Sequence, residues 1–364
     1  MKLTIVVALC ALVSCTRDKD DETGLDDSAS GALTALTDPC GGAATPNALH
    51  FTSETDGWVG CGSASGVHHT TDGGASFTDE SPTSEFYAYQ VVSEPDGGLL
   101  LCGQGSDSGL VWRRAGVSWT QLLAYDASNT NDVVNIRTCG QVAAAGDGRL
   151  IMSGLTSGDI TWSTNGGTTW SPAERYWEDA NFGGGGGGQT SYPFMRLESV
   201  GGQFFGAGGN ATHPPVFLGL STRPDGAFYN MHAYVVDEAI LGEVWSMATP
   251  DGGGSWLVGG RDQDRSAEAS GFLYRTVDGG ESWSIPDFPD DIDIVQDIAF
   301  HDDGQRGLAV GHRYPPDAGF ILYTSDAGQT WEALEDAPTA LWRVSIAGDS
   351  FWVAGDGYLG MGTL

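Results

Sequence analysis

The chain has 364 residues, with 48 acidic and 16 basic side chains, so its formal net charge is −32. Its only lysines, Lys2 and Lys19, precede the predicted fold. Because phosphate backbones and anionic lipids attract basic surfaces, this balance excludes both as partners of the folded part. The 55 glycines and 12 tryptophans suit many short strands joined by tight turns, so we expect an all-β protein without long helices.

The first residues predict an export signal. Lys2 is followed by an apolar run over 3–13, which is too short to cross a bilayer because a spanning helix needs about 20 residues. The run ends at Ser14-Cys15, in a pattern that resembles the bacterial lipobox, whose cysteine is lipidated and becomes the mature N-terminus. This predicts a signal peptide over 1–14 and lipidation of Cys15. The alternative is an ordinary secretory signal with an incidental cysteine.

The segment 15–32 is polar and acidic, which predicts a disordered tether before a folded domain over 33–364. Thr16 follows the cysteine where an inner-membrane lipoprotein has Asp, and by resemblance to Gram-negative lipoproteins this favours the outer membrane. We therefore expect a cell-envelope lipoprotein, periplasmic or surface-exposed, that meets the membrane only through its anchor.

Four later segments repeat the pattern S/T-x-D/N-x-G-x-S/T-W/F, at 70–77, 163–170, 276–283 and 324–331. Their third residues are Asp72, Asn165, Asp278 and Asp326. Their final aromatic residues are Phe77, Trp170, Trp283 and Trp331. Weaker copies at 112–119 and 221–228 fill the gaps, so the aromatic residues recur at intervals of 42 to 58 residues, about one four-stranded blade each.

Each conserved position of this repeat has a structural role. The Asp or Asn is expected to accept hydrogen bonds from backbone amides two residues on, and the Gly permits the positive φ of a tight turn. The final aromatic ring is expected to pack against the next sheet. The repeats, together with a strand near 32–39 that closes the ring, predict a single seven-bladed β-propeller.

The repeated pattern is similar to the Asp-box, or BNR repeat, of sialidases, sortilin-type receptors and photosystem II assembly factors. Over its whole length the chain most resembles the Ycf48-like assembly factors, which are non-enzymatic, single seven-bladed propellers, some of them lipoproteins. The chain departs from that group in its acidity, its two degenerate boxes and a six-glycine insert at 183–188. The resemblance implies a binding role but does not extend to a photosynthetic one.

A ligand site is expected where the innermost strands begin, because propellers gather loops there around a central channel. Aligning these starts gives one equivalent residue from each blade: Ala48, Gln90, Arg137, Arg196, Ser246, Asp297 and Arg343. Arginine suits bidentate capture of carboxylate or phosphate, and the aromatic residues Tyr89, Trp245 and Trp342 directly precede three of these positions. The site is predicted to take a protein or glycan ligand. The alternative is that the arginines only pair with local acids in a crowded channel.

We expect a monomeric, non-catalytic binding or scaffold module without a cofactor or metal; the sequence has no Cys-x-x-Cys pair typical of zinc sites. The alternative is an exo-acting glycoside hydrolase of the sialidase type. The F/Y-R-I-P motif of sialidases is absent, and the sequence does not single out the two carboxylates that glycoside hydrolysis needs.

The four cysteines left after export, in an oxidising compartment, allow three pairings. Cys102 ends the second strand of blade 2 and Cys139 begins blade 3, both near the loop-bearing face. This favours a Cys102–Cys139 disulfide and leaves Cys40–Cys61 to fasten the closing strand.

Overall fold

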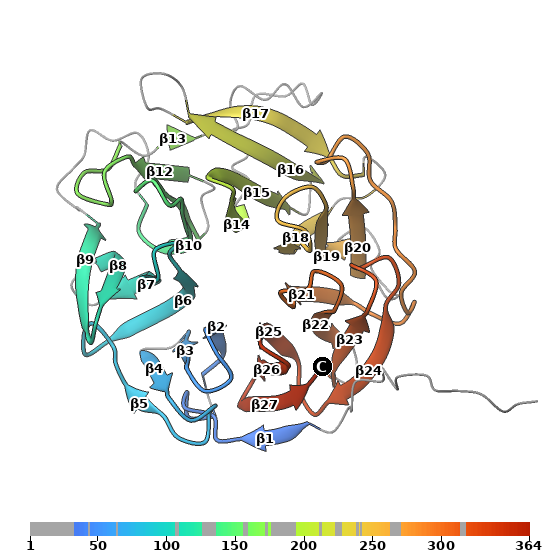
Figure 1. Ribbon diagram of the computed structural model, residues 1–364, viewed down its shortest axis with the longest axis horizontal. Helices are drawn as coiled ribbons and strands as arrows, with labels where there is room; N and C mark the ends of the chain where they lie inside the picture. The colour runs from blue at the N-terminus through green and yellow to red at the C-terminus, as the bar shows by residue number, and fades with distance from the viewer. Residues whose placement is uncertain are drawn as a thin grey trace, which may run out of the picture.

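The computed structural model describes residues 33–364 except 43, 63–64, 106–108, 126–135, 156–158, 172–173, 176–193, 211–212, 223–227, 238–239, 241, 263–270 and 314–317. Seven antiparallel sheets surround a central axis as the blades of a propeller (Figure 1). This confirms the predicted fold. The predicted signal peptide over 1–14, Cys15 and the tether over 15–32 lie outside the described residues, as does the six-glycine insert.

The strands follow one another outward from the axis in chain order. Blade 1 has β2 (Pro46–Phe51), β3 (Gly57–Cys61), β4 (Val67–Thr70) and β5 (Thr78–Asp79). Blade 2 has β6 (Phe86–Ser93), β7 (Leu99–Gly105), β8 (Gly109–Ala115) and β9 (Ser118–Ala124). Blade 3 has β10 (Cys139–Ala144), β11 (Leu150–Gly154), β12 (Asp159–Ser163) and β13 (Glu174–Arg175). Blade 4 has β14 (Phe194–Val200), β15 (Gln203–Asn210), β16 (His213–Thr222) and β17 (Phe228–Val235).

The remaining blades differ from one another in their outermost strand. Among the described residues, blade 5 has three strands, β18 (Gly242–Ala248), β19 (Trp256–Asp262) and β20 (Gly271–Thr276). Blade 6 has β21 (Ile294–Phe300), β22 (Gly307–Arg313), β23 (Ala318–Thr324) and β24 (Glu332–Ala337). Blade 7 has β25 (Leu341–Ala347), β26 (Ser350–Gly355), β27 (Tyr358–Thr363) and, on its outer edge, β1 (Thr34–Leu36).

The core lies between the blades. Every residue of the second strands β3 and β26 is buried, whereas only one residue of the outer strand β24 is. A second strand is covered on both faces by neighbouring blades, so it is apolar throughout and lacks the alternation of a half-exposed strand. Each hydrophobic cluster accordingly joins two adjacent blades, as where Val59 of blade 1 meets Trp352 of blade 7.

The ring closes through the N-terminal strand, as the sequence predicts. β1 pairs antiparallel with β27, placing Thr34 opposite Met361 and Leu36 opposite Leu359. The last blade thus receives its outer strand from the first described residues, so the edge of β27 is paired and the two ends of the chain are joined in one sheet.

Both predicted disulfides are confirmed. Cys40 pairs with Cys61 across a Cα separation of 5.5 Å, and Cys102 pairs with Cys139 across 5.4 Å. The first joins the segment after the closing strand to blade 1. The second joins blade 2 to blade 3, next to the start of β10.

The repeated segments form hydrogen-bonded turns, which we call clasp turns. In blade 6, Thr324 Oγ1 donates to Asp326 Oδ1 (2.8 Å) and accepts from the Gly328 amide (3.0 Å). The Asp326 carboxylate then accepts from the amide (2.9 Å) and the hydroxyl (2.7 Å) of Thr330. The same pattern occurs at Asp72 and Asp278. Asn165 likewise accepts from the Thr169 amide, but its Nδ2 donates to the Thr169 hydroxyl. The prediction that the Asp or Asn accepts from the amide two residues on was wrong. Its side chain accepts from the amide four residues on and so closes a wider turn.

A fifth clasp turn lies at 249–256, between β18 and β19, where sequence reasoning missed it. Asp251 accepts from the Ser255 amide (2.7 Å), and Thr249 Oγ1 accepts from the Gly253 amide (2.8 Å). The segment Thr-Pro-Asp-Gly-Gly-Gly-Ser-Trp matches the repeat at every defined position. It was overlooked because it precedes a second strand rather than a fourth.

The final aromatic residues of the clasp turns contact the preceding blade, not the next one as expected. Trp283 of blade 5 meets Phe217 of blade 4 with ring centroids 5.5 Å apart, and Trp170 of blade 3 donates to the Leu122 carbonyl of blade 2 (2.9 Å). Trp331 of blade 6 packs with Leu257 of blade 5. Each clasp turn therefore fastens its blade to the one before it.

Candidate ligand site

A β-bulge recurs at the same place in all seven blades, early in the innermost strand. The residues inserted there are Asn47, Tyr89, Gly140, Met195, Trp245, Gln296 and Trp342. The residues that resume the pairing are Ala48, Gln90, Gln141, Arg196, Ser246, Asp297 and Arg343. We call these positions the bulge ring. A bulge bends its strand and re-aims side chains, and bulges are frequent beside functional sites.

The bulge ring agrees with the sequence alignment in six blades and corrects it in blade 3. The equivalent residue there is Gln141, and the predicted Arg137 precedes β10, where it is exposed. The Arg137 guanidinium lies 5.9 Å from the centroid of the Tyr125 ring, outside the bulge ring. The matching Gln-Val pairs at 90–91 and 141–142 are the sequence signal that could have given the correct alignment.

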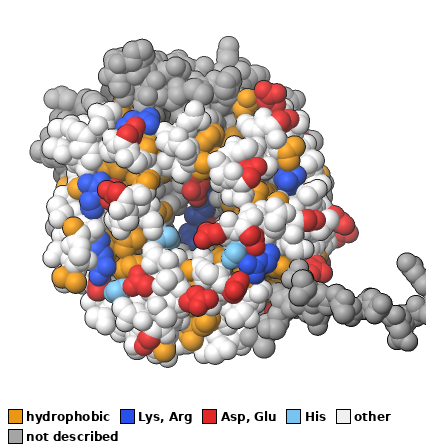
Figure 2. Space-filling model, in the orientation of Figure 1, with side chains coloured by type: hydrophobic (Ala, Val, Ile, Leu, Met, Phe, Trp, Pro, Cys, Tyr) orange, Lys and Arg blue, Asp and Glu red, His pale blue; other side chains and the backbone are white. Residues whose placement is uncertain are grey.

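Four of the predicted site residues line one small cavity in the channel. Tyr89, Arg196, Trp245 and Arg343 enclose about 60 Å³. Gly140, Gln141 and Leu155 complete the lining, and sequence reasoning had not selected them. Figure 2 shows a hollow at the centre of the ring with basic side chains in its depth and acidic ones around it. These basic groups are arginines, because both lysines of the chain precede residue 33.

Arg196 is buried, and an acid holds it in place. Its Nη2 donates to Asp297 Oδ1 (2.8 Å) and to the carbonyl of Gln296 (3.3 Å). The other oxygen of Asp297 accepts from the Val344 amide (3.1 Å). Asp297 therefore links blades 4, 6 and 7 across the channel, and this arginine has the local acidic partner that the alternative interpretation expected.

Arg343 has a different environment, because the hydrogen bonds described for it go to backbone carbonyls. Its Nε donates to the carbonyl of Asn47 and its Nη1 to that of Trp342, both at 2.6 Å. Burial, and then the nearby Arg196, lower the pKa of Arg343 to about 9, although Asp297 opposes the shift. The group remains cationic at neutral pH.

Glu198 adds a titratable group that the sequence did not single out. It lies on β14, two residues beyond Arg196 and on the same side of the strand. Burial raises the pKa of Glu198 to about 7, with Arg196 lowering it and Asp297 raising it. Near neutral pH this carboxyl therefore changes charge close to Arg196 and Asp297.

Several buried polar atoms of the bulge ring have no hydrogen-bond partner among the described residues. They are Trp245 Nε1, Ser246 Oγ, Gln141 Oε1 and Gln296 Oε1. A buried polar group without a partner is costly. Trp245 and Gln141 line the cavity, so their unpaired atoms indicate a place that a polar ligand or water can satisfy.

Trp342 lies apart from this cavity. Its Nε1 donates to Asp356 Oδ1 (3.0 Å), and its ring tilts against His312 at a centroid distance of 5.5 Å. Of the predicted ligand residues, the structure thus brings Tyr89, Arg196, Trp245 and Arg343 together, with Asp297 bound to Arg196, and places Arg137 and Trp342 elsewhere.

The described part of the chain contains no cluster of three or more His, Cys, Asp or Glu side chains arranged to hold a metal ion. It also contains no helix that is long and apolar enough to cross a membrane.

No protein-family model matches the sequence, and no curated protein matches it. Among solved structures, YCF48 bound to D1 peptide is 16% identical, with a TM-score of 0.57 over 91% of this chain and 97% of that one. YCF48 from Cyanidioschyzon merolae is 14% identical, with a TM-score of 0.62 over 91% and 98% of the two chains. An inactive virginiamycin B lyase from Staphylococcus aureus with quinupristin is 10% identical, with a TM-score of 0.63 over 92% and 99%. These similarities establish the propeller fold. The Ycf48-like and lyase-like propellers are structural neighbours of this chain.

Proposed function

We propose that this protein is a non-catalytic binding module of the cell envelope, whose bulge ring binds a carboxylate of a partner protein. The main support is the cavity lined by Arg196 and Arg343, with the unpaired indole of Trp245 beside it. With Glu198 protonated, the two guanidinium groups face one ion-paired carboxylate, Asp297, so the group carries a net positive charge. Arginine recognises a carboxylate through paired hydrogen bonds.

The size of the cavity favours the end of a peptide over a sugar ring. Cavities that bind small molecules usually have about 300–1,000 Å³, whereas a water molecule needs about 10–15 Å³. The cavity of about 60 Å³ therefore suits a few waters or one carboxylate group. A propeller of the same fold, YCF48, has been solved with a bound D1 peptide, which agrees with a peptide ligand.

The proposal is tested by titrating the full-length chain with N-acetylated Ala-Phe as the free acid and as the C-terminal amide, by calorimetry. We expect the acid to bind about tenfold more tightly, because only it can pair with Arg343. Arg343→Gln should remove that preference. Arg137→Gln is the matched control, since it removes an exposed arginine outside the bulge ring. Equal binding of acid and amide, or equal effects of the two substitutions, would contradict the proposal.

Glycoside hydrolysis is the second candidate, favoured by one observation. Glu198 and Asp297 lie close enough to influence one another, and burial raises the pKa of Glu198 to about 7, as is typical of a general acid. Fluorogenic glycosides, a sialoside included, test it directly. Turnover that Glu198→Gln abolishes would replace the binding proposal with an enzymatic one.

We also propose that Cys15 is lipidated and holds the monomeric propeller at the outer membrane. The support is the apolar run followed by Ser14-Cys15. Cys15→Ala should release the protein from sedimented membranes, whereas Cys10→Ala, a cysteine inside the predicted signal, should not. Retention of the Cys15→Ala protein in the membrane fraction would contradict lipidation.

A further inference from the structure

Gln141 lines the cavity of the bulge ring, but its side chain makes no hydrogen bond within the described fold. The residue is only 5% exposed, and neither its amide oxygen nor its amide nitrogen has a partner among the described residues. Burying an amide without hydrogen bonds is costly. An amide that lines a cavity and is free at both ends is therefore available to a ligand that both donates and accepts.

The equivalent positions of two other blades show that this freedom is not imposed by the bulge. Gln90 Oε1 of blade 2 accepts from the Val142 amide of blade 3 (2.7 Å). Asp297 of blade 6 likewise accepts from the Val344 amide of blade 7 (3.1 Å). In both cases the side chain that follows the bulge joins its blade to the next one. Among the described hydrogen bonds, Gln141 forms none of this kind with blade 4, so its amide remains available.

The other polar groups of the cavity are donors. Arg343 uses its Nε and Nη1 within the fold, and no hydrogen bond is described for its Nη2. The indole nitrogen of Trp245 is an unpaired donor as well. These donors suit the oxygens of a carboxylate. A carboxylate has no hydrogen to give to Gln141 Oε1, however, so a ligand that satisfies the whole cavity carries a donor next to its carboxylate.

In a polypeptide these two groups are closest at the C-terminus. The α-carboxylate and the N–H of the last residue are attached to the same carbon, whereas the side-chain carboxylate of Asp or Glu is separated from that carbon. The cavity of about 60 Å³ has room for little beyond the carboxylate, which favours the closer pair. In an extended residue the N–H and the C=O point to the same side, as in a hydrogen-bonded antiparallel pair, so one side-chain amide can bind both.

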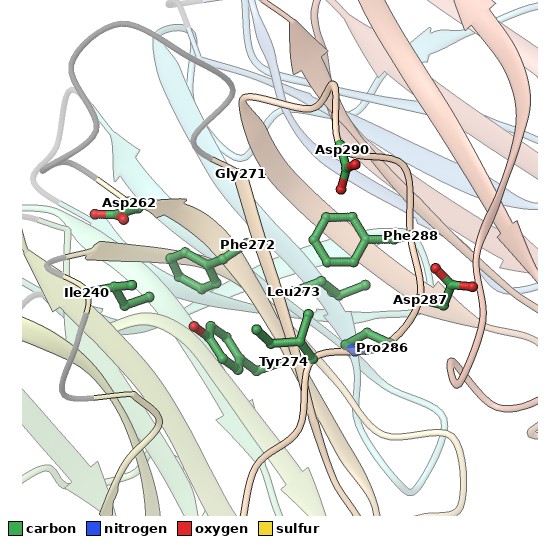
Figure 3. Close-up of a pocket in the computed structure, with 11 residues that line it drawn as sticks. Ile240, Asp262, Gly271, Phe272, Leu273, Tyr274, Pro286, Asp287, Phe288 and Asp290 are labelled. Atoms are coloured by element: carbon green, nitrogen blue, oxygen red, sulfur yellow. The ribbon is translucent and has the colours of Figure 1, made fainter.

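The groove beside β20 does not offer this combination. It has a volume of about 340 Å³, and Figure 3 shows the rings of Phe272 and Phe288 with Asp262 and Asp290 around it. Three aspartates and no basic residue line the groove, so it would repel a carboxylate. None of the unpaired buried side-chain atoms of the described residues belongs to its lining. The bulge ring is therefore the cavity that suits a C-terminus.

We propose that the ligand of the bulge ring is the free C-terminus of a partner protein, recognised through its α-carboxylate and the N–H of the same residue. Arg343 and the Trp245 indole donate to the carboxylate. Gln141 Oε1 accepts from the N–H, and Gln141 Nε2 donates to a carboxylate oxygen. This inference rests on the proposed function above and adds to it the residue that distinguishes a C-terminus from other carboxylates.

The probes are N-acetylated Ala-Phe and its ester analogue, in which an oxygen atom replaces the N–H of the phenylalanine, titrated into the full-length chain by calorimetry. The two share nearly the same shape and the same carboxylate, but only the peptide donates to Gln141 Oε1. We expect the ester to bind about fivefold more weakly, the usual contribution of one hydrogen bond. Equal binding of peptide and ester, with the acid still preferred over the C-terminal amide, would overturn this inference alone. Equal binding of acid and amide would overturn the carboxylate site as well.

Gln141→Met locates the effect. Methionine has a similar length and makes no strong hydrogen bonds, so peptide and ester should bind this variant about equally. Gln121→Met is the matched control, since it changes an exposed glutamine on β9 and should keep the fivefold difference. The midpoint of chemical denaturation should be unchanged in Gln141→Met, because the side chain has no partner in the fold. The peptide and ester comparison in the native chain needs no variant. A fivefold difference that persists in Gln141→Met, or that disappears in Gln121→Met, would refute this role of Gln141.

Discussion

The clasp turns and the bulge ring are repeated parts of the same blades, but they use repetition in opposite ways. At the clasp turns the same side chains make the same hydrogen bonds, as at Thr70 in blade 1 and Thr324 in blade 6. At the bulge ring the backbone repeats in every blade, while the side chain after the bulge ranges from Ala48 to Arg343. The turns hold blades together, which requires uniform chemistry. The ring presents five residue types from seven blades, and such variety is what a recognition surface requires.

The largest predicted difference between the two regions is in stability. Trp331→Ala empties a site that is only 5% exposed, so it should lower the free energy of unfolding by about 3–5 kcal/mol. Trp342→Ala, in the bulge ring, removes a partly exposed ring with one hydrogen bond and should cost about 1 kcal/mol. Chemical denaturation of both variants measures this. Equal losses would mean that the clasp tryptophans do not hold the blades.

The two disulfides separate stability from binding. Replacing both cysteines of either pair by serine should lower the free energy of unfolding by about 3 kcal/mol in the chain-entropy account. Only the loss of Cys102–Cys139 should also weaken carboxylate binding, because Cys139 directly precedes the bulge at Gly140 and Gln141 lines the cavity. Chemical denaturation compares the stability of the two variants, and peptide titration compares their carboxylate binding. Loss of binding in the Cys40–Cys61 variant alone would reverse the assignment.

The Asp that accepts the hydrogen bonds of a clasp turn should tolerate replacement by Asn. Asp326→Ala loses the hydrogen bonds from Thr330 and should cost about 1–2 kcal/mol, whereas Asp326→Asn should cost much less because Asn165 fills this role in blade 3. Burial raises the pKa of Asp326, but the Thr330 hydrogen bonds outweigh it and hold that pKa below its usual value. A carboxyl whose pKa is lowered in the folded state stabilises the protein when the pH is above its pKa in the unfolded chain. This stabilisation is lost as the pH falls through the pKa of the folded state. Denaturation below pH 4 should therefore show a smaller pH dependence in Asp326→Asn, and equal costs for Ala and Asn would exclude this role.

The smallest effect is expected at Ala327. It adopts a φ of 59°, where the clasp turns of blades 1, 3 and 5 have glycine. The left-handed conformation costs a non-glycine residue about 1–2 kcal/mol. Glycine removes this cost but also raises the conformational entropy of the unfolded chain, which offsets part of the gain. Ala327→Gly should therefore stabilise the protein by about 0.5–1 kcal/mol, measured by thermal unfolding. Destabilisation would show that the turn holds Ala327 without strain.

The features that could be predicted from the sequence are those determined by local residue patterns. The clasp turns reveal the blade count because each is a continuous eight-residue pattern, and the blade count in turn places the closing strand and the cysteines. The bulges were not predictable, since a register shift depends on the pairing of two strands and leaves no fixed residue type. Arg137 was misaligned because its blade was aligned without the Gln-Val pair that blades 2 and 3 share at 90–91 and 141–142. Nor was the three-stranded form of blade 5 predictable, since it shows only where Arg275 pairs with Ser284 and Pro286, which has no amide hydrogen, follows two residues later.

The bulge ring is tested most directly by the pH dependence of carboxylate binding. N-acetylated Ala-Phe stays anionic from pH 6 to 8, so any change in affinity comes from the protein. Because the pKa of Glu198 is about 7, rising pH adds a negative charge beside Arg196 and Asp297, both of which also act on Arg343. We predict that the affinity falls severalfold across this range in the native chain and stays constant in Glu198→Gln. Affinity that does not change with pH in the native chain, or that falls equally in Glu198→Gln, would contradict a carboxylate site at the bulge ring.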